Sequence, residues 1–207
     1  HLEAFFVQPD RTAANAPALL LCHGFPSKQR PGIPSRSYEQ FAERLAEEQG
    51  WLVLAVSLRG CGQSEGQFSM EGWLDDVRRS VAHLRNEGSQ RIWLVGSTTG
   101  GSLAIMAAAQ DPEIRGIAVM APRADFDDWA SDPRRFLQHC RNVGVVKDES
   151  YPDSVQQWSQ QLRKHRAIDF VESIGSRPML ILHGTNDRQV PPDDARQLAS
   201  LHPNPEL

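Results

Sequence analysis

Glycine, serine and threonine fill every position from Gly96 to Gly101, and this run constrains the fold more than any other feature of the chain. An apolar run at residues 92–95 precedes it, and a run of small apolar residues at 102–109 follows it. A short apolar run bounded by glycine is typical of a buried strand, whereas the longer run is typical of a helix. The sequence therefore predicts a strand, a tight turn and a helix in direct succession.

The same alternation of short apolar runs and longer amphipathic patterns extends along most of the chain. Strands that are apolar on both faces and alternate with helices indicate a mostly parallel sheet covered on both sides, which is a doubly wound α/β fold. Such sheets bind ligands at the carboxyl ends of their strands. We expect strands at residues 2–7, 18–22, 52–56, 92–95, 117–120 and 179–182, and helices at residues 38–49, 73–86, 99–110 and 193–201.

One stretch, residues 123–177, breaks this alternation because it contains no convincing strand. It is polar, and its periodicity predicts two helices at about residues 125–142 and 154–173. A plain connection of this length is unusual between strands, which favours a helical cap over the strand ends. We therefore divide the chain into a first core part at residues 1–122, the cap at 123–177 and a continued core part at 178–207.

The composition fits one globular domain and argues against several classes of partner. The 207 residues carry a net charge of −4 and are 40% hydrophobic, which allows a single core but gives no basic surface for nucleic acid or an anionic membrane. No apolar run approaches the ~20 residues that span a bilayer. The composition does not predict the oligomeric state.

The three cysteines are widely spaced and odd in number, so they do not indicate a disulfide framework. A reducing, cytoplasmic location is the default expectation for such a chain. No cysteines and histidines have the spacing of a zinc site, and we expect neither a metal nor an organic cofactor. The adjacent carboxylates of Asp75 and Asp76 would not face one another on a helix, so we expect them to be structural.

The glycine turn fits the pattern G-x-S-x-G, whose central serine attacks a carbonyl group, except that its centre is Thr98. The centre of such a turn has unfavourable backbone angles, and β-branched residues tolerate these worst. Centring the pattern on Ser97 would place Val95 and Thr99 where small residues are needed, and centring it on Thr99 would again give a threonine. A slow natural enzyme, an engineered or inactivated variant and a non-catalytic relative all remain open.

Three further segments stand in order around this turn, each after an apolar run: residues 23–26 (HGFP), 58–66 (LRGCGQSEG) and 182–187 (LHGTND), the last followed by Val190-Pro191. With the glycine turn, they resemble the α/β-hydrolase superfamily, in particular esterase- or acylaminopeptidase-like serine hydrolases with a helical cap after the sixth strand. The matching pieces cover nearly all of the chain. The resemblance implies an α/β-hydrolase fold and a site that transfers an acyl group.

The resemblance assigns roles to four residues. It implies that Thr98 takes the nucleophile position, that Asp187 is the acid, and that the backbone N–H groups of Phe25 and Thr99 form the oxyanion hole. In isolation, the histidine at position 23 would be structural and Asp187 would be an ordinary turn aspartate.

The catalytic histidine of this family follows the acid after one more strand, and we expect that it is not in this chain. His202 lies at the end of a helix pattern and is expected on the surface, whereas His183 is expected to be buried packing. A catalytic role is not favoured for His139 and His165 of the cap. We therefore expect that the C-terminal part, with the last strand, the histidine loop and the final helix, is missing.

The leading hypothesis is a hydrolase that acts on a carboxylic ester, a thioester or a small amide, with a small ester-type substrate as its partner. The alternative is a catalytically impaired or inactive protein of the same fold that binds a small ligand or a protein. Four cap aromatics could line an apolar acyl pocket or pack the cap onto the core: Trp129, Phe136, Trp158 and Phe170.

Overall fold

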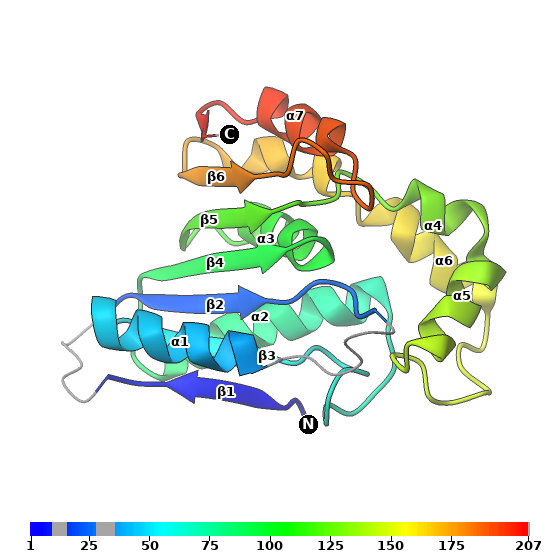
Figure 1. Cartoon of the computed structure of the whole chain (residues 1–207), viewed down its shortest axis with the longest axis horizontal. Helices are drawn as coiled ribbons and strands as arrows, with labels where there is room; N and C mark the ends of the chain where they lie inside the picture. The colour runs from blue at the N-terminus through cyan, green and yellow to red at the C-terminus, as the bar shows by residue number, and fades with distance from the viewer. Residues whose placement is uncertain (10–15, 28–35, 207) are drawn as a thin grey trace.

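The computed structural model of the chain describes residues 1–9, 16–27 and 36–206. Its strands are β1 (Ala4–Val7), β2 (Ala18–Cys22), β3 (Leu52–Val56), β4 (Ile92–Ser97), β5 (Ile114–Met120), β6 (Met179–Leu182) and β7 (Pro205–Glu206). In the described part of the chain, these seven strands form one sheet in the order β1-β3-β2-β4-β5-β6-β7 (Figure 1). β1 is antiparallel to β3 and the other neighbours are parallel, so the predicted mostly parallel α/β fold is confirmed.

The sheet includes a short strand near the end of the sequence, where we expected none. β7 is two residues long and pairs in parallel with Met179 and Leu180 of β6. The prediction that the last strand lies outside this chain is therefore wrong for these two residues. β5 also begins earlier than predicted, at Ile114, because Ile114 pairs with Ile92 of β4.

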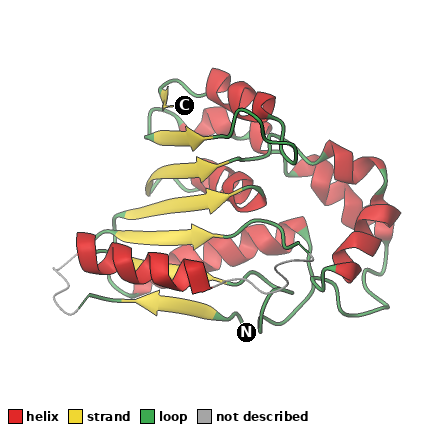
Figure 2. Ribbon diagram, in the orientation of Figure 1, coloured by secondary structure: helices red, strands yellow, loops and turns green. Residues whose placement is uncertain are grey.

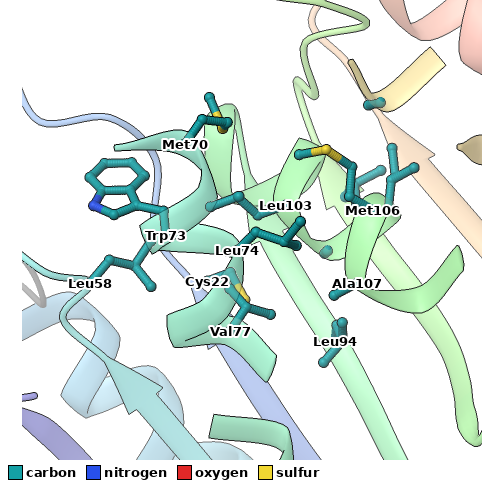
Figure 3. Close-up of a cluster of buried hydrophobic side chains, with 14 of the residues drawn as sticks. Cys22, Leu58, Met70, Trp73, Leu74, Val77, Leu94, Leu103, Met106 and Ala107 are labelled. Atoms are coloured by element: carbon teal, nitrogen blue, oxygen red, sulfur yellow. The ribbon is translucent and has the colours of Figure 1, made fainter. Parts of the chain in front are cut away.

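Helices cover both faces of the sheet, as the doubly wound pattern predicts. α1 (Arg36–Gln49) lies on one face, and α2 (Met70–Asn86) and α3 (Thr99–Gln110) lie on the other (Figures 1 and 2). Successive residues of β2 alternate between these layers, since Leu19 packs in the cluster with α1 and Leu20 in the cluster with α2 and α3. Figure 3 shows the second cluster, with side chains that include Cys22, Leu58, Met70, Trp73, Leu74, Leu94, Leu103 and Met106.

Between β5 and β6 the chain forms a helical insertion, whose first part lies beyond the carboxyl ends of the strands and whose last residues return along α3 (Figures 1 and 2). It contains α4 (Asp127–Ser131), α5 (Pro133–Asn142), α6 (Val155–Lys164) and the 3₁₀ turns η1 (Ala167–Asp169) and η2 (Val171–Ile174), and α7 (Pro192–Leu201) follows β6. Among the described residues, β1 is the only strand before β2, so the insertion follows the fifth described strand rather than a sixth.

The two long helices predicted for the insertion are each interrupted. Asp132 and Pro133 separate α4 from α5, because the Asp132 side chain accepts the N–H of Arg135 at 3.1 Å and thereby starts a new helix. α6 ends at Lys164, and the two 3₁₀ turns take the place of its predicted continuation.

His23, just after β2, ties the end of that strand to the loop after β3. Its Nε2 accepts the backbone N–H of Leu58 at 2.9 Å, so Nδ1 carries the proton and donates it to the carbonyl of Gly24 at 2.8 Å. The side chain is fully buried, and burial lowers the pKa of His23 to about 4. This imidazole is therefore neutral at neutral pH and holds two loops together.

A buried ion pair holds the loop after β3 against α2. Nη2 of Arg59 lies 2.7 Å from Oδ1 of Asp76, and the Nε and backbone N–H groups of Arg59 donate to the same carboxylate. The Asp76 side chain is 2% exposed, whereas that of Asp75, which also reaches Arg59, is 40% exposed. The expectation that these adjacent aspartates are structural is confirmed.

Replacing the buried carboxylate by an amide should destabilise the fold far more than the same change at its exposed neighbour. Asp76→Asn leaves Arg59 without its main partner and should lower the free energy of unfolding by about 3 kcal/mol. Asp75→Asn is the matched control and should lower it by less than about 1 kcal/mol. Urea unfolding followed by tryptophan fluorescence measures both changes, and equal losses would contradict the role given to Asp76.

The lowered pKa of His23 predicts a loss of stability in acid. Between pH 6.5 and about 4, the unfolded chain takes up a proton that the buried imidazole does not, so the free energy of unfolding falls as the pH falls. This group alone should account for a decline of about 3 kcal/mol, measured by urea unfolding across that range. His83→Gln, which removes a half-exposed histidine, should leave the decline unchanged. An imidazole NMR signal of His23 that titrates at the ordinary histidine pKa would refute this explanation.

Candidate active site

The turn between β4 and α3 has an unusual backbone conformation at its centre. Thr98 has a φ of 47° and a ψ of −117°, a region that β-branched residues rarely adopt. Its N–H donates to the carbonyl of Met120 in β5 at 2.8 Å, which fixes the turn against the neighbouring strand. Thr99 is the first residue of α3 and is buried, so the turn centres on Thr98.

Three glycines let the backbone segments around this turn meet at close range. A Cβ on Gly96 would overlap the carbonyl of Gly100, and a Cβ on Gly100 would overlap the carbonyl of Cys22 at the end of β2. A Cβ on Gly24 would overlap Oγ1 of Thr98. Only glycine fits these positions. The Thr98 hydroxyl therefore lies directly against the backbone of the loop after β2.

Two unpaired backbone N–H groups belong to the residues that directly follow this contact. Phe25 follows Gly24, and Thr99 follows Thr98 as the first residue of α3. Among the described residues, neither N–H has a hydrogen-bond acceptor. The first N–H groups of a helix are free to bind a ligand, and the helix dipole favours negative charge there. In the described structure, Phe25 and Thr99 thus each carry a backbone N–H group without an acceptor, directly after Gly24 and Thr98.

Ser97 faces the opposite side of the sheet from α3. Because strand residues alternate, it lies on the α1 face of β4, where its Oγ is 3.1 Å from Oη of Tyr38. An apolar cavity of about 390 Å³ lies on this face and is lined by Ser97, Phe41, Val95 and Met120 among others. The side chains of Ser97 and Thr98 therefore lie on different sides of the sheet.

Asp187 lies in the turn after β6, at the carboxyl edge of the sheet. Its Oδ1 accepts the N–H groups of Gln189 at 2.8 Å and Val190 at 3.0 Å. These two bonds, that of Val190 first, lower the pKa of the Asp187 carboxyl, so it is ionised at neutral pH. Since β5 lies between β4 and β6, the structure brings Asp187 and Thr98 to the same edge but two strands apart.

His183 supports the Asp187 turn from the end of β6. Its Nε2 lies 3.0 Å from the carbonyl of Val190 and 3.8 Å from Oδ2 of Asp187. Its side chain is 4% exposed, so the prediction of a buried packing histidine is confirmed. The Nδ1 atom is buried and has no partner within the described ranges.

In the part of the chain that the structure describes, no histidine is hydrogen-bonded to Thr98. The prediction that His202 lies on the surface is wrong, because its residue is only 3% exposed. α7 ends against β6 and β7, and this packing covers the imidazole, whose Nδ1 accepts the N–H of Asn204 at 3.2 Å.

The helical insertion carries a cavity of about 410 Å³ beside the loop after β2. Trp129 and Phe136 line this cavity, and their rings lie 5.0 Å and 5.6 Å from the ring of Phe25 between centroids. The wall is polar as well as aromatic, because the short helices α4 and α5 direct charged side chains into it. The other lining residues are Asp128, Ser131, Asp132, Arg135 and His139.

The other two aromatics expected in an acyl pocket do not line this cavity. Trp158 is buried, and its Nε1 donates to the carbonyl of Phe68 at 3.0 Å. Phe170 packs against the main hydrophobic core. For these two rings, the packing alternative is the correct one.

Arg123 is a residue of this region that we did not single out from the sequence. Its backbone N–H and carbonyl both bond to Oγ of Ser102 in α3, at 3.1 Å and 2.7 Å. Its Nη2 lies 2.6 Å from Oδ1 of Asp128, and its guanidinium lies 4.8 Å from the ring centroid of Trp129. Arg123 therefore links α3 to the residues that line the cavity. Its position three residues after the end of β5 is the sequence feature that could have identified it.

Within the described ranges, no group of three or more histidines, cysteines and carboxylates could hold a metal ion. None of the helices there is long and apolar enough to cross a membrane. All three cysteines are buried free thiols, and burial raises the pKa of Cys22 and Cys61 to about 12. At neutral pH these two side chains are therefore protonated.

Comparisons with known sequences agree with this geometry. Residues 13–173 match the sequence model of the family described as serine aminopeptidase, S33. The uncharacterized protein YfhR of Escherichia coli O157:H7 is 26% identical over 161 residues, which cover 76% of this chain and 50% of that protein. The thiohydrolase aneE of Aspergillus aculeatus is 32% identical over 185 residues, which cover 84% of this chain and 54% of that protein. The chain thus spans about half the length of these curated relatives.

Solved structures show the same fold. Est1E from Butyrivibrio proteoclasticus with ferulic acid bound has a TM-score of 0.73 at 22% identity, over 100% of this chain and 84% of that chain. The uncomplexed acylaminoacyl peptidase of Pyrococcus horikoshii has a TM-score of 0.68 at 15% identity, over 97% of this chain and 32% of that chain. The matched family model covers well over half of the chain, and the sheet order, the glycine turn and these likenesses agree with it. The chain belongs to the serine aminopeptidase S33 family of α/β-hydrolases.

Proposed function

We propose that this chain carries the acyl-transfer site of a hydrolase that acts on carboxylic esters, thioesters or small amides. The single observation that carries the proposal is the contact between Oγ1 of Thr98, on the strained turn, and the backbone of Gly24, each directly followed by a backbone N–H group that has no acceptor among the described residues. An acyl-transfer site needs a nucleophile and oxyanion donors in this relation.

In the proposed reaction, Oγ1 of Thr98 attacks the carbonyl carbon of the substrate and its proton passes to a histidine base. The N–H groups of Phe25 and Thr99 bind the oxygen that becomes negative, and the position of Thr99 at the start of α3 adds the helix dipole. The base then protonates the leaving alcohol, thiol or amine, and water releases the acyl group by the reverse steps.

Asp187 is the proposed acid that orients the base. Its carboxyl is held ionised by two backbone N–H groups, which suits an orienting acid that stays unprotonated. The backbones at the ends of β4 and β6 are separated by two strand spacings, about 10 Å. The side chains of Thr98 and Asp187, with an imidazole hydrogen-bonded between them, can bridge this distance. As the resemblance to this family implies, we propose that the base is a histidine outside this sequence.

The insertion is the proposed cap that selects the substrate. Trp129, Phe136 and His139 form an aromatic wall over Phe25, which suits a substrate with a planar group. Ferulic acid bound to Est1E is a planar aromatic acid, and this likeness supports an aromatic ester as the first substrate to test.

The alternative is a protein of this fold that binds a small ligand or a partner without turnover. Thr98 favours it, because the β-carbon methyl crowds the attacking oxygen and the backbone is strained at this residue. The two proposals differ in whether residue 98 supports turnover.

Thr98→Ser should raise kcat/KM for a chromogenic aryl ester by about tenfold or more, since it removes the methyl group and relieves part of the strain. Thr98→Ala should remove the activity, and Ser97→Ala, which changes the hydroxyl on the opposite face, should leave the activity of Thr98→Ser within about twofold. Steady-state kinetics of the full-length protein, which carries the proposed histidine base, on aryl esters, thioesters and anilides measures these changes. If neither the parent nor Thr98→Ser hydrolyses any of them, the ligand-binding alternative replaces the enzyme.

A further inference from the structure

The ring of Phe25 is the point where the core and the helical insertion meet. Two of its neighbours belong to the core side, the ring of Phe68 at 5.3 Å and that of Trp73 at 5.6 Å between centroids. On the other side are three rings of the insertion, at 5.0 Å for Trp129, 5.6 Å for Phe136 and 5.8 Å for His139. Phe25 is thus clamped between two parts of the chain that are far apart in sequence.

The core side of this clamp is fixed. Phe68 and Trp73 are fully buried, and Nε1 of Trp73 donates to the carbonyl of Arg59 at 2.9 Å. Rings that are buried and hydrogen-bonded in this way have little freedom to move. Any freedom that the Phe25 ring has is therefore limited to the side of the insertion.

On the insertion side, Phe136 is buried, Trp129 is half-buried and His139 is exposed, and all three rings line the cavity. Trp129 and Phe136 stack on each other with centroids 4.3 Å apart and planes 18° apart. His139 is exposed and stacks on Phe25 with planes 24° apart, and no hydrogen bond of its side chain competes with this contact within the described residues. His139 is thus the outermost ring of the clamp.

The backbone of Phe25 has little freedom apart from its ring. Gly24 before it is pressed against Oγ1 of Thr98 and its carbonyl is held by His23. Pro26 after it restricts the ψ angle of Phe25 to extended values. The direction of the Phe25 N–H is therefore coupled to where the ring sits, and an oxyanion donor works only within a narrow range of positions.

We propose that the insertion sets the position of the Phe25 N–H through this ring, and that His139 and Trp129 are positioning residues for the oxyanion donor. The inference rests on the proposed function for its catalytic meaning, but the mechanical coupling does not depend on turnover. In this arrangement, the cap affects the rate of the chemical step and does more than select what binds.

The coupling is tested by the backbone order parameter of the Phe25 N–H, measured by ¹⁵N relaxation on protein labelled at its eight phenylalanines. The Phe25 signal is the one that disappears in Phe25→Leu. In the parent, the order parameter should be near the value of about 0.85 that rigid backbone gives, and His139→Ala should lower it clearly. His139→Phe keeps a stacked ring and should restore it.

His165→Ala is the matched control, because His165 lies in the same insertion and has no ring contact with Phe25 in the described structure. It should leave the Phe25 order parameter unchanged. An unchanged order parameter in His139→Ala, or an equal loss in His165→Ala, would overturn the inference, since the second result would indicate general loosening of the insertion.

Kinetics on an aryl ester supplies the second measurement. His139→Ala should lower kcat by about two- to tenfold with KM unchanged, and His139→Phe should recover kcat. A rise in KM alone would mean that His139 only contacts the substrate, which contradicts a positioning role. If no variant or parent shows turnover, the proposed function fails while the order parameter still decides the coupling.

Discussion

The close approach of three backbone segments at the glycine turn is the constraint on which the rest of this structure depends. The end of β2, the end of β4 and the start of α3 meet where Gly24, Gly96 and Gly100 leave no room for a side chain. That approach forces Thr98 to a φ of 47° and places its hydroxyl against the loop after β2. Any side chain at these glycines would push the segments apart and with them the hydroxyl and its neighbouring N–H groups.

Two sets of polar contacts in the core stabilise the loops next to these segments. The neutral imidazole of His23 joins the loop after β2 to the loop after β3, and the Arg59–Asp76 pair joins that second loop to α2. Strain at one residue persists only where the surroundings determine its conformation, and these contacts supply that support. The site thus stands on the rigid core, while the cavity that would select a substrate belongs to the insertion.

Much of the core followed from the sequence, because its signals are local. Six strands were predicted from short apolar runs, since strands of a parallel sheet are buried on both faces, and the spacing of Gly96 and Gly100 predicted the turn between β4 and α3. β7 was not predicted, because two residues carry no periodicity and pair only through β6. His202 was misplaced because its burial comes from tertiary packing at the end of α7, which no local pattern shows.

The insertion was the least predictable part, because its contacts are not local. Helical periodicity indicated helices, but it could not show that Asp132 starts a new one or that Trp158 packs inward while Trp129 lines a cavity. Nor does any pattern show that one phenylalanine beside the glycine turn touches five other rings. The resemblance to the family implied a backbone donor at Phe25, whereas the ring contacts of its side chain appear only in the folded structure.

The central claim is that residue 98 occupies the nucleophile position of an acyl-transfer site. Peptide mapping by mass spectrometry, after treatment of the full-length Thr98→Ser protein with an alkyl fluorophosphonate, tests this most directly. The account predicts a single adduct on residue 98. Ser97 should stay unmodified because its hydroxyl lies on the opposite face of the sheet, and Ser102 because its hydroxyl is hydrogen-bonded to Arg123. An adduct on either of those serines, or no adduct at residue 98, would contradict it.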